Sequence, residues 1–304
     1  RKCLHEASRR SHLSGTSRNN IMKRIPSIAK PKIAVQLNKS LINKSFRRNV
    51  TGECSTEKEI PLDPSATEFY YRPNHSRGFG DFGWLQAKYS FSFSPFYKEP
   101  KHRGFRKLRV INEDIVQPGK GFEPHSHQNM EIITYVLKGA IEHKDSLGNG
   151  SIIRPGEVQR MTAGRGITHS EFNPSATDPL HLLQIWIIPA ETGLTPGYEQ
   201  VKYNVAEKVD KFKLIAGPQG GNEAVKINQD SYIYASEITE GQEVKYNLAE
   251  NRGAWIHVVS GCVVMSEWKL HAGDGLGISK PMEICLRKAK GSNEKTEVLL
   301  FDLN

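Results

Sequence analysis

The 304-residue sequence has few cysteines, and their positions argue against two classes of cross-linked fold. The four are Cys3, Cys54, Cys262 and Cys285, and no two of them form a CxxC pair. A disulfide-rich scaffold or a zinc finger needs a denser and more regular arrangement. We therefore expect a reducing compartment, with Cys262 and Cys285 packed as small hydrophobic side chains.

Long hydrophobic runs and long helical periods are also missing. The longest strongly apolar run, from Leu180 to Pro189, is interrupted by His181 and Gln184. A membrane-spanning helix needs about 20 apolar residues, so we predict no transmembrane helix and no membrane partner. No segment keeps a sustained 3.6-residue hydrophobic period, and few helices are expected.

Acidic residues are scarce at one end of the chain. Residues 1–55 contain 13 lysines and arginines but only Glu6 and Glu53, whereas the rest has 29 basic and 31 acidic residues. The overall charge of +9 therefore belongs to the N-terminal segment. The remainder, slightly acidic, has no electrostatic basis for direct binding to nucleic acid.

The N-terminal segment is predicted to be a separate extension. Residues 1–66 are basic and lack a hydrophobic period, so we expect them to be disordered. The acid-free stretch from Met22 to Val50 is typical of an organellar transit peptide, but a solvated basic tail fits equally well, and a nuclear-import patch less well. The expected location is cytoplasmic or nuclear, or mitochondrial if this segment is a transit peptide.

The rest of the chain predicts short strands separated by turns. Residues 89–93 alternate strictly between aromatic and serine side chains, as in a half-buried strand. Further strands are expected at 108–112, 131–137, 151–154, 181–188, 231–236 and 255–259. This pattern favours an all-β sandwich or barrel.

A faint internal repeat predicts two barrels in tandem. Residues 135–139 (YVLKG) resemble 257–261 (HVVSG), and each is followed by a related turn, Pro155–Glu157 or Ala272–Asp274. We place an N-terminal domain at 67–190 and a C-terminal domain at 191–304. His257 and His271 are isolated, so we expect the second barrel to lack a metal and to support the first.

Two pairs of residues in the first barrel have metal-ligand spacing. His125 and His127, and then His169 and Glu171, are two positions apart, and such residues share one face of a strand. A single His-x-His pair is weak evidence, but two pairs in one predicted barrel are stronger. Three imidazoles and a carboxylate suit a divalent ion with open positions, such as Fe(II), Mn, Co, Ni, Cu or Zn.

Glu131 has the same parity as His125 and His127, and would face the same interior if the strand ran unbroken. Two other histidines of this barrel, His143 and His181, are expected to be core or strand-end residues.

These residues resemble known motifs. The pattern Gly119-x5-His125-x-His127-x3-Glu131-x7-Gly139 resembles the first cupin motif, and residues 162–171 (TAGRGITHSE) resemble the signature of the pirin family. The likeness extends over residues 68–304, and residues 193–199 (GLTPGYE) resemble the bacterial, quercetinase-like branch.

The resemblance implies a bicupin with one metal, most often Fe(II), in the N-terminal barrel, bound by His125, His127, His169 and Glu171. Most cupins use the position of Glu131 as a ligand. The pirin pattern uses Glu171 instead and leaves Glu131 as a nearby proton-handling group. Arg160 stands where some pirins have an aromatic residue, and it is expected to alter the surroundings of the site.

The implied function is a monomeric dioxygenase. A flavonol such as quercetin and O2 would be the substrates, Glu171 and Glu131 the candidate proton-transfer residues, and ring cleavage would release carbon monoxide. One alternative is a metal-binding transcriptional coregulator that acts through protein partners. Another is an enzyme of the same kind that uses a different enolic or aromatic substrate.

Overall fold

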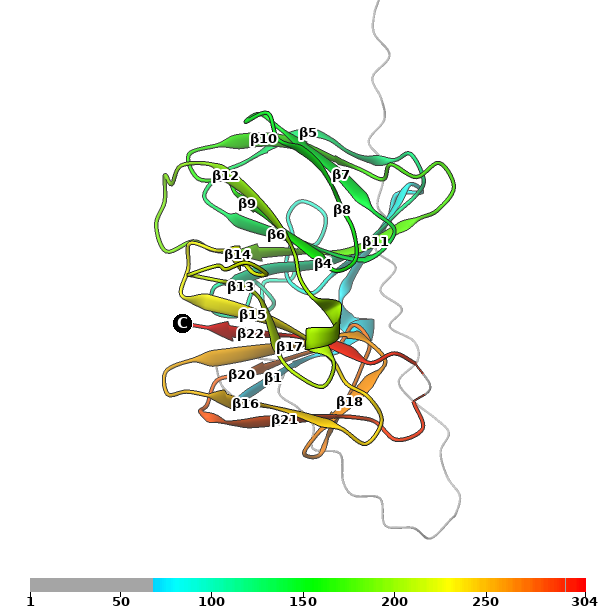
Figure 1. Cartoon of the computed structure of the whole chain (residues 1–304), viewed down its shortest axis with the longest axis vertical. Helices are drawn as coiled ribbons and strands as arrows, with labels where there is room; N and C mark the ends of the chain where they lie inside the picture. Colours follow the sequence, from blue (N-terminus) through cyan, green and yellow to red (C-terminus); the bar gives the residue numbers. More distant parts are fainter. Residues whose placement is uncertain (1–67, 293) are drawn as a thin grey trace, which may run out of the picture. The chain divides into compact units, whose positions relative to one another are not determined.

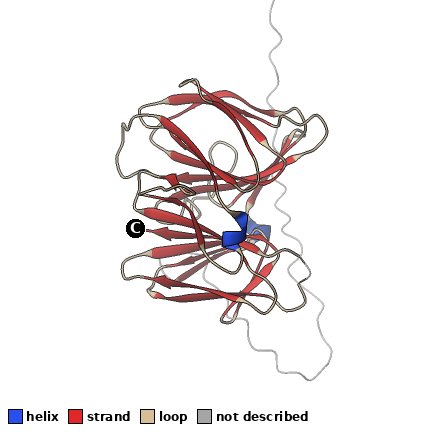
Figure 2. Cartoon of the chain, viewed as in Figure 1, coloured by secondary structure: helices blue, strands red, loops and turns tan. Residues whose placement is uncertain are grey.

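The computed structural model describes residues 68–292 and 294–304, and this part of the chain is almost entirely β (Figure 2). Two short 3-10 helices, Asn74–Ser76 and Val205–Lys208, accompany 22 strands. No helix within the described ranges is long and apolar enough to cross a bilayer. The prediction of an all-β fold is confirmed, whereas the predicted extension at 1–66 lies outside the described residues.

The first barrel is built from two sheets, which Figure 1 shows in its upper half. The four-stranded sheet has the order β5-β10-β7-β8, with bounds Gly121–His127, Ile167–Phe172, Ile141–Asp145 and Gly150–Ile153. The seven-stranded sheet has the order β12-β9-β6-β11-β4-β3-β2, with bounds Gly197–Lys202, Glu157–Thr162, Glu131–Lys138, Leu180–Ile187, Leu108–Val116, Leu85–Tyr89 and Gly78–Asp81.

The second barrel repeats this arrangement. Its four-stranded sheet has the order β16-β21-β18-β19, with bounds Glu243–Leu248, Met282–Lys288, Cys262–Met265 and Trp268–His271. Its seven-stranded sheet has the order β1-β20-β17-β22-β15-β13-β14, with bounds Phe69–Arg72, Gly275–Ile278, Gly253–Ser260, Glu297–Leu303, Ser231–Glu237, Lys213–Gly217 and Val225–Lys226.

The internal repeat of the sequence corresponds to equivalent strands. Its two copies fall on β6 and β17, and each strand is followed by a glycine with positive φ, +81° at Gly139 and +72° at Gly261. Only glycine adopts that conformation without strain. The later turns of the repeat likewise have glycines with positive φ, at Gly156 and Gly273. The tandem arrangement expected from the sequence is therefore present in the structure.

Each barrel includes one strand from the other half of the chain. β1, from the start of the expected N-terminal domain, pairs with β20 of the second barrel. β12, from beyond the expected boundary at residue 190, pairs with β9 of the first barrel. Each barrel thus takes one strand from across the expected boundary at residue 190.

Alternation along the strands divides the hydrophobic core into layers. The two seven-stranded sheets face each other across a shared core that includes Ile133, Leu183, Trp255 and Phe301. The interior of the second barrel is filled by its own cluster, with Val244, Leu248, Ile284 and Leu286 from the strands equivalent to β5 and β10. Where the first barrel has histidines, the second has apolar packing.

Candidate metal centre

The pairing of β5 with β10 brings together the histidines that the sequence singled out. His169 pairs with His125, and Ile167 with His127. The ligand atoms of His125, His127 and His169 all lie within 4.8 Å of one another. Three imidazole nitrogens this close can bind one divalent ion.

A β-bulge shapes the strand pair beside this cluster. Between the pairs His169↔His125 and Glu171↔Phe122, the register shifts, so Glu123 and Pro124 together face Ser170. Pro124 has no N–H for the ladder, which suits it to a bulge. The strands approach closely here, since a Cβ at Gly121 would lie 2.2 Å from the backbone oxygen of Glu171. The bulge and this glycine set where the Glu171 side chain emerges.

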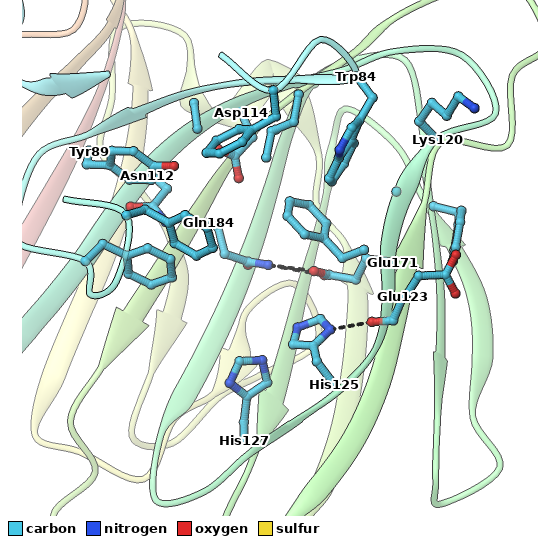
Figure 3. Close-up of a pocket in the computed structure, with 18 of the residues that line it drawn as sticks. Trp84, Tyr89, Asn112, Asp114, Lys120, Glu123, His125, His127, Glu171 and Gln184 are labelled. Carbon is cyan, nitrogen blue, oxygen red and sulfur yellow. Dashed lines mark hydrogen bonds between the residues drawn. The ribbon is translucent and has the colours of Figure 1, made fainter. Parts of the chain in front are cut away.

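His125 and His127 are held in forms that can bind a metal. The Nδ1 atom of His125 lies 2.8 Å from the backbone oxygen of Glu123 and donates to it (Figure 3). A proton on Nδ1 leaves the Nε2 lone pair free. Burial, and then the neighbouring His125, lowers the pKa of His127 to about 4. His127 is therefore a neutral imidazole at physiological pH.

His169 is oriented by a chain of buried groups behind it. The Nε2 atom of His143 lies 3.1 Å from Asp145 Oδ2, and the two Nδ1 atoms of His143 and His169 are 3.4 Å apart. Burial lowers the pKa of His143 despite the opposing effect of Asp145, so this imidazole is neutral. With its one proton on Nε2 facing Asp145, its Nδ1 accepts from His169 Nδ1–H.

That tautomer leaves His169 Nε2 without a proton. The atom is buried and has no hydrogen-bond partner. Burial, and then the nearby imidazoles, lowers the pKa of His169 to about 2, so its Nε2 lone pair stays unprotonated. An orphaned buried nitrogen beside two further imidazole nitrogens fits a metal ligand.

Glu171 belongs to a second, overlapping group, with His143 and His169, and it is held by a different partner. Its ligand atom lies within 4.8 Å of those of His143 and His169, and both its carboxylate oxygens accept from Gln184 Nε2, at 3.2 and 3.0 Å (Figure 3). Thr134 Oγ1 in turn donates to Gln184 Oε1. Burial raises the pKa of Glu171 to about 7, although Gln184 opposes this. This carboxyl group can thus exchange a proton near neutral pH.

Glu131 is not part of this cluster. The assumption of an unbroken strand is wrong: β5 ends at His127, β6 begins at Glu131 in the other sheet, and Asn129 between them has a φ of +51°. Glu131 shares the face of Ile133 and Tyr135, toward the core between the barrels. It accepts hydrogen bonds from Thr162 and from Asn228 of the second half of the chain.

Arg160 also points away from the metal cluster. It donates to the backbone oxygen of Lys226 and to Glu199, and its Nε lies 4.0 Å from Glu131. The expectation that it alters the surroundings of the site is therefore wrong. It belongs to the polar contacts on the opposite face of the sheet.

A pocket of about 760 Å³ opens in front of the histidines. His125, His127 and Glu171 lie in its wall, together with Gln184, Asn112 and Asp114. The rest of the lining is mainly aromatic and includes Phe82, Trp84, Tyr89, Phe93, Phe96, Phe122 and Trp186. This volume accommodates a drug-sized aromatic molecule.

Asp145 is a functional candidate that sequence reasoning missed, and His143 was expected to be only a core or strand-end residue. They repeat the spacing of two positions seen in His125-x-His127 and His169-x-Glu171. Their strand β7 pairs with β10, placing Asp145 opposite His169 and His143 opposite Glu171. A search for every His-x-His/Asp/Glu pair within the predicted barrel would have found them. His181, by contrast, lies on β11 of the seven-stranded sheet, on the face away from the pocket, and bonds to Glu113.

Family models match both halves of the chain. The Pirin model matches residues 72–187, and the model described as the quercetinase C-terminal cupin domain matches residues 214–303. These matches place a cupin domain in each half.

Curated relatives and solved structures agree with these matches. The chain is 42% identical over 234 residues to quercetin 2,3-dioxygenase from Escherichia coli K12, covering 77% of this chain and 98% of that protein. It is 39% identical to a putative quercetin 2,3-dioxygenase of Pseudomonas aeruginosa, over 76% of this chain and 98% of that one.

A crystal structure of the bacterial pirin YhhW from Escherichia coli, in complex with nickel(II), matches with a TM-score of 0.71 and 41% identity, over 77% of this chain and 98% of that one. Identity at this level over nearly the whole relative, together with the family match, settles the membership. The chain belongs to the pirin family.

Proposed function

We propose that the protein is a metal-dependent dioxygenase that cleaves a flavonol of the quercetin type. The observation that carries the proposal is the three-histidine cluster with Glu171 at the wall of an aromatic pocket. Its relatives named quercetin 2,3-dioxygenase support the reaction class. The fused and pendant aromatic rings of a flavonol can pack against the aromatic side chains that line the pocket.

His125, His127, His169 and Glu171 are the proposed ligands of one divalent ion. Fe(II) is our first candidate, and nickel, manganese, cobalt, copper and zinc are alternatives, since a nickel-bound pirin is known among the relatives. When bound, the ion would supply Lewis-acid chemistry for the oxygen atoms of the substrate. The backbone oxygen of Glu123 accepts from His125 Nδ1–H, and His143 Nδ1 accepts from His169 Nδ1–H. These two bonds keep both imidazoles in the tautomer with a free Nε2.

Glu171 is the proposed proton acceptor. In its ionised form, its carboxylate can take the proton of the flavonol hydroxyl. Gln184 holds both carboxylate oxygens toward the pocket, and the amide can keep its donor there while Glu171 changes protonation state. The surrounding aromatic side chains exclude water and hold the flat ring system. Glu131, bonded elsewhere, has no part in this mechanism.

The overall reaction defines the test. One flavonol and one O2 would give one carboxylic ester (a depside) and one carbon monoxide. Protein loaded separately with each metal should consume O2 and quercetin in equal amounts and release an equal amount of carbon monoxide. His127→Gln should abolish turnover, whereas His271→Gln, at an exposed histidine of the second barrel, should not. Metal-loaded protein that consumes no O2 with any of these ions would contradict the proposal.

A further inference from the structure

The pocket has a second polar region on β4, away from the histidines. Side chains alternate along this strand, so Asn112 and Asp114 face the pocket, whereas Ile111 faces the core between the barrels. Asn112 lies opposite Gln184 of β11 and Tyr89 of β3 in the sheet register. In Figure 3 the Asp114 carboxyl group points into the pocket, and Gln184 lies between it and His127.

Both side chains are buried and incompletely bonded. Each is 5% exposed, and Asn112 Oδ1 and Asp114 Oδ1 have no hydrogen-bond partner. A buried polar atom without a partner destabilises the fold, so most such atoms in proteins are satisfied. Two orphaned oxygens on one face of one strand, both on side chains that line a cavity, indicate that a ligand can complete them.

The surroundings limit what that ligand can be. Glu171 and Asp114 lie in the same pocket wall, so an anionic group is disfavoured there. Burial, and then Glu171 and Glu113, raises the pKa of Asp114 to about 8, so its carboxyl group keeps its proton at neutral pH and gives a cation no counter-charge. A neutral carboxyl group donates and accepts, and an amide oxygen accepts. A neutral hydroxyl group complements both.

We propose that Asn112 and Asp114 form a hydroxyl-binding subsite that selects aromatic substrates carrying a phenolic hydroxyl at the end remote from the metal cluster. The inference rests on the proposed function and deepens it, because it names what distinguishes a favoured substrate from a bare flavonol. The aromatic side chains that line the pocket hold the ring system, and the two polar regions supply the hydrogen bonds. Both residues are specificity-determining groups rather than proton-transfer groups.

The test compares two ligands that share the metal-facing oxygens. Quercetin and 3-hydroxyflavone both carry the 3-hydroxyl and 4-carbonyl, but 3-hydroxyflavone lacks every other hydroxyl. Binding is measured without O2, from the absorbance of each flavonol added to nickel-loaded protein. We expect the wild type to prefer quercetin by roughly tenfold, which is the effect of one or two good hydrogen bonds.

Asp114→Leu should remove most of that preference by weakening quercetin binding while leaving 3-hydroxyflavone within about threefold. Asn112→Leu should act in the same direction, so the test stands even if one variant fails to fold. Phe96→Leu is the matched control, because this exposed pocket residue is apolar. It should weaken both ligands alike and preserve the ratio.

The outcomes separate the two proposals. If both leucine variants bind nickel and keep the wild-type preference, or if the wild type shows none, the subsite is refuted. O2 uptake on quercetin is measured in parallel with the wild type. If the variants lose the preference but the wild type takes up no O2, the subsite stands and the dioxygenase is rejected. If the variants keep the preference and the wild type takes up O2, the dioxygenase stands and the subsite is rejected.

Discussion

We predict that Asp145, which contacts His143, sets the tautomer of His169 through that residue. In the wild type its Oδ2 accepts from His143 Nε2–H, which makes His143 Nδ1 the acceptor for His169. Asp145→Asn keeps the Oδ1 bonds to the backbone N–H groups of Leu147 and Asn149. However, the side-chain amide of the Asp145→Asn variant can donate to His143 Nε2. The His143 imidazole would then carry its own proton on Nδ1. His169 would have to move its own proton to Nε2, the atom needed by the metal.

The magnitude follows from the kind of contact that is changed. Substitution of the group that orients a metal-bound histidine typically weakens metal binding by about 10–100-fold, or about 1.4–2.8 kcal/mol. We expect the upper part of that range, because the side chains of His143 and Asp145 are fully buried and water cannot replace the lost bond. The assay is competition for nickel against a coloured chelator of known affinity.

Glu142→Gln is the matched control. This neighbouring residue of β7 pairs with the exposed Lys144 at the surface, so its substitution should leave nickel affinity unchanged. Wild-type nickel affinity in Asp145→Asn, with an unchanged melting temperature, would refute the reasoning that the buried chain sets the tautomer of His169.

Three further predictions concern stability and geometry. In the metal-free protein, Asp114 is favoured in its protonated form when folded, so stability is lost as pH rises from about 4 through about 8. Asp114→Asn, which stays neutral, should therefore exceed the wild type in unfolding free energy by on the order of 2 kcal/mol at pH 8.5, with a smaller gap at pH 5, measured by denaturant titration. Gly121→Ala should lower stability by about 1–3 kcal/mol and weaken nickel binding, because the added methyl group displaces the Glu171 backbone; unchanged nickel affinity would contradict it. Trp255→Ala should cost about 3–5 kcal/mol by thermal unfolding, since the indole packs on Tyr70, Phe91 and Phe105 in the shared core; a loss below 1 kcal/mol would show that the core relaxes around the cavity.

The sequence predicted what depends on local periodicity. Strand alternation, the repeated glycine turns and the spacing of His125, His127, His169 and Glu171 all have a period of two or a fixed offset, and the structure has most of the corresponding strands and turns. The strand predicted at residues 89–93 is wrong, because β3 ends at Tyr89 and Phe93 forms only an isolated bridge with Tyr97. The same rule placed Glu131 wrongly, because a turn at Asn129 moves the chain into the other sheet and resets which face is inward. Parity carries no information across such a turn.

Features that depend on long-range pairing could not be predicted. The contact between His143 and His169 requires β7 to lie beside β10, and the pocket requires β3, β4 and β11 to be neighbours. The orphaned oxygens of Asn112 and Asp114 become visible only when the rest of the cavity is in place. No spacing within one strand reveals these relations.

The pairing of β1 with β20 has a consequence for synthesis of the chain. Phe69 pairs with Ile278, so β1 emerges from the ribosome roughly 200 residues before its partner strand. At a synthesis rate of about 5–20 residues per second, β1 is exposed for about 10–40 s before its partner strand β20 is made. The second barrel therefore closes only when the chain is almost finished, and a nascent chain stalled before β20 would carry β1 as an unpaired strand open to other partners.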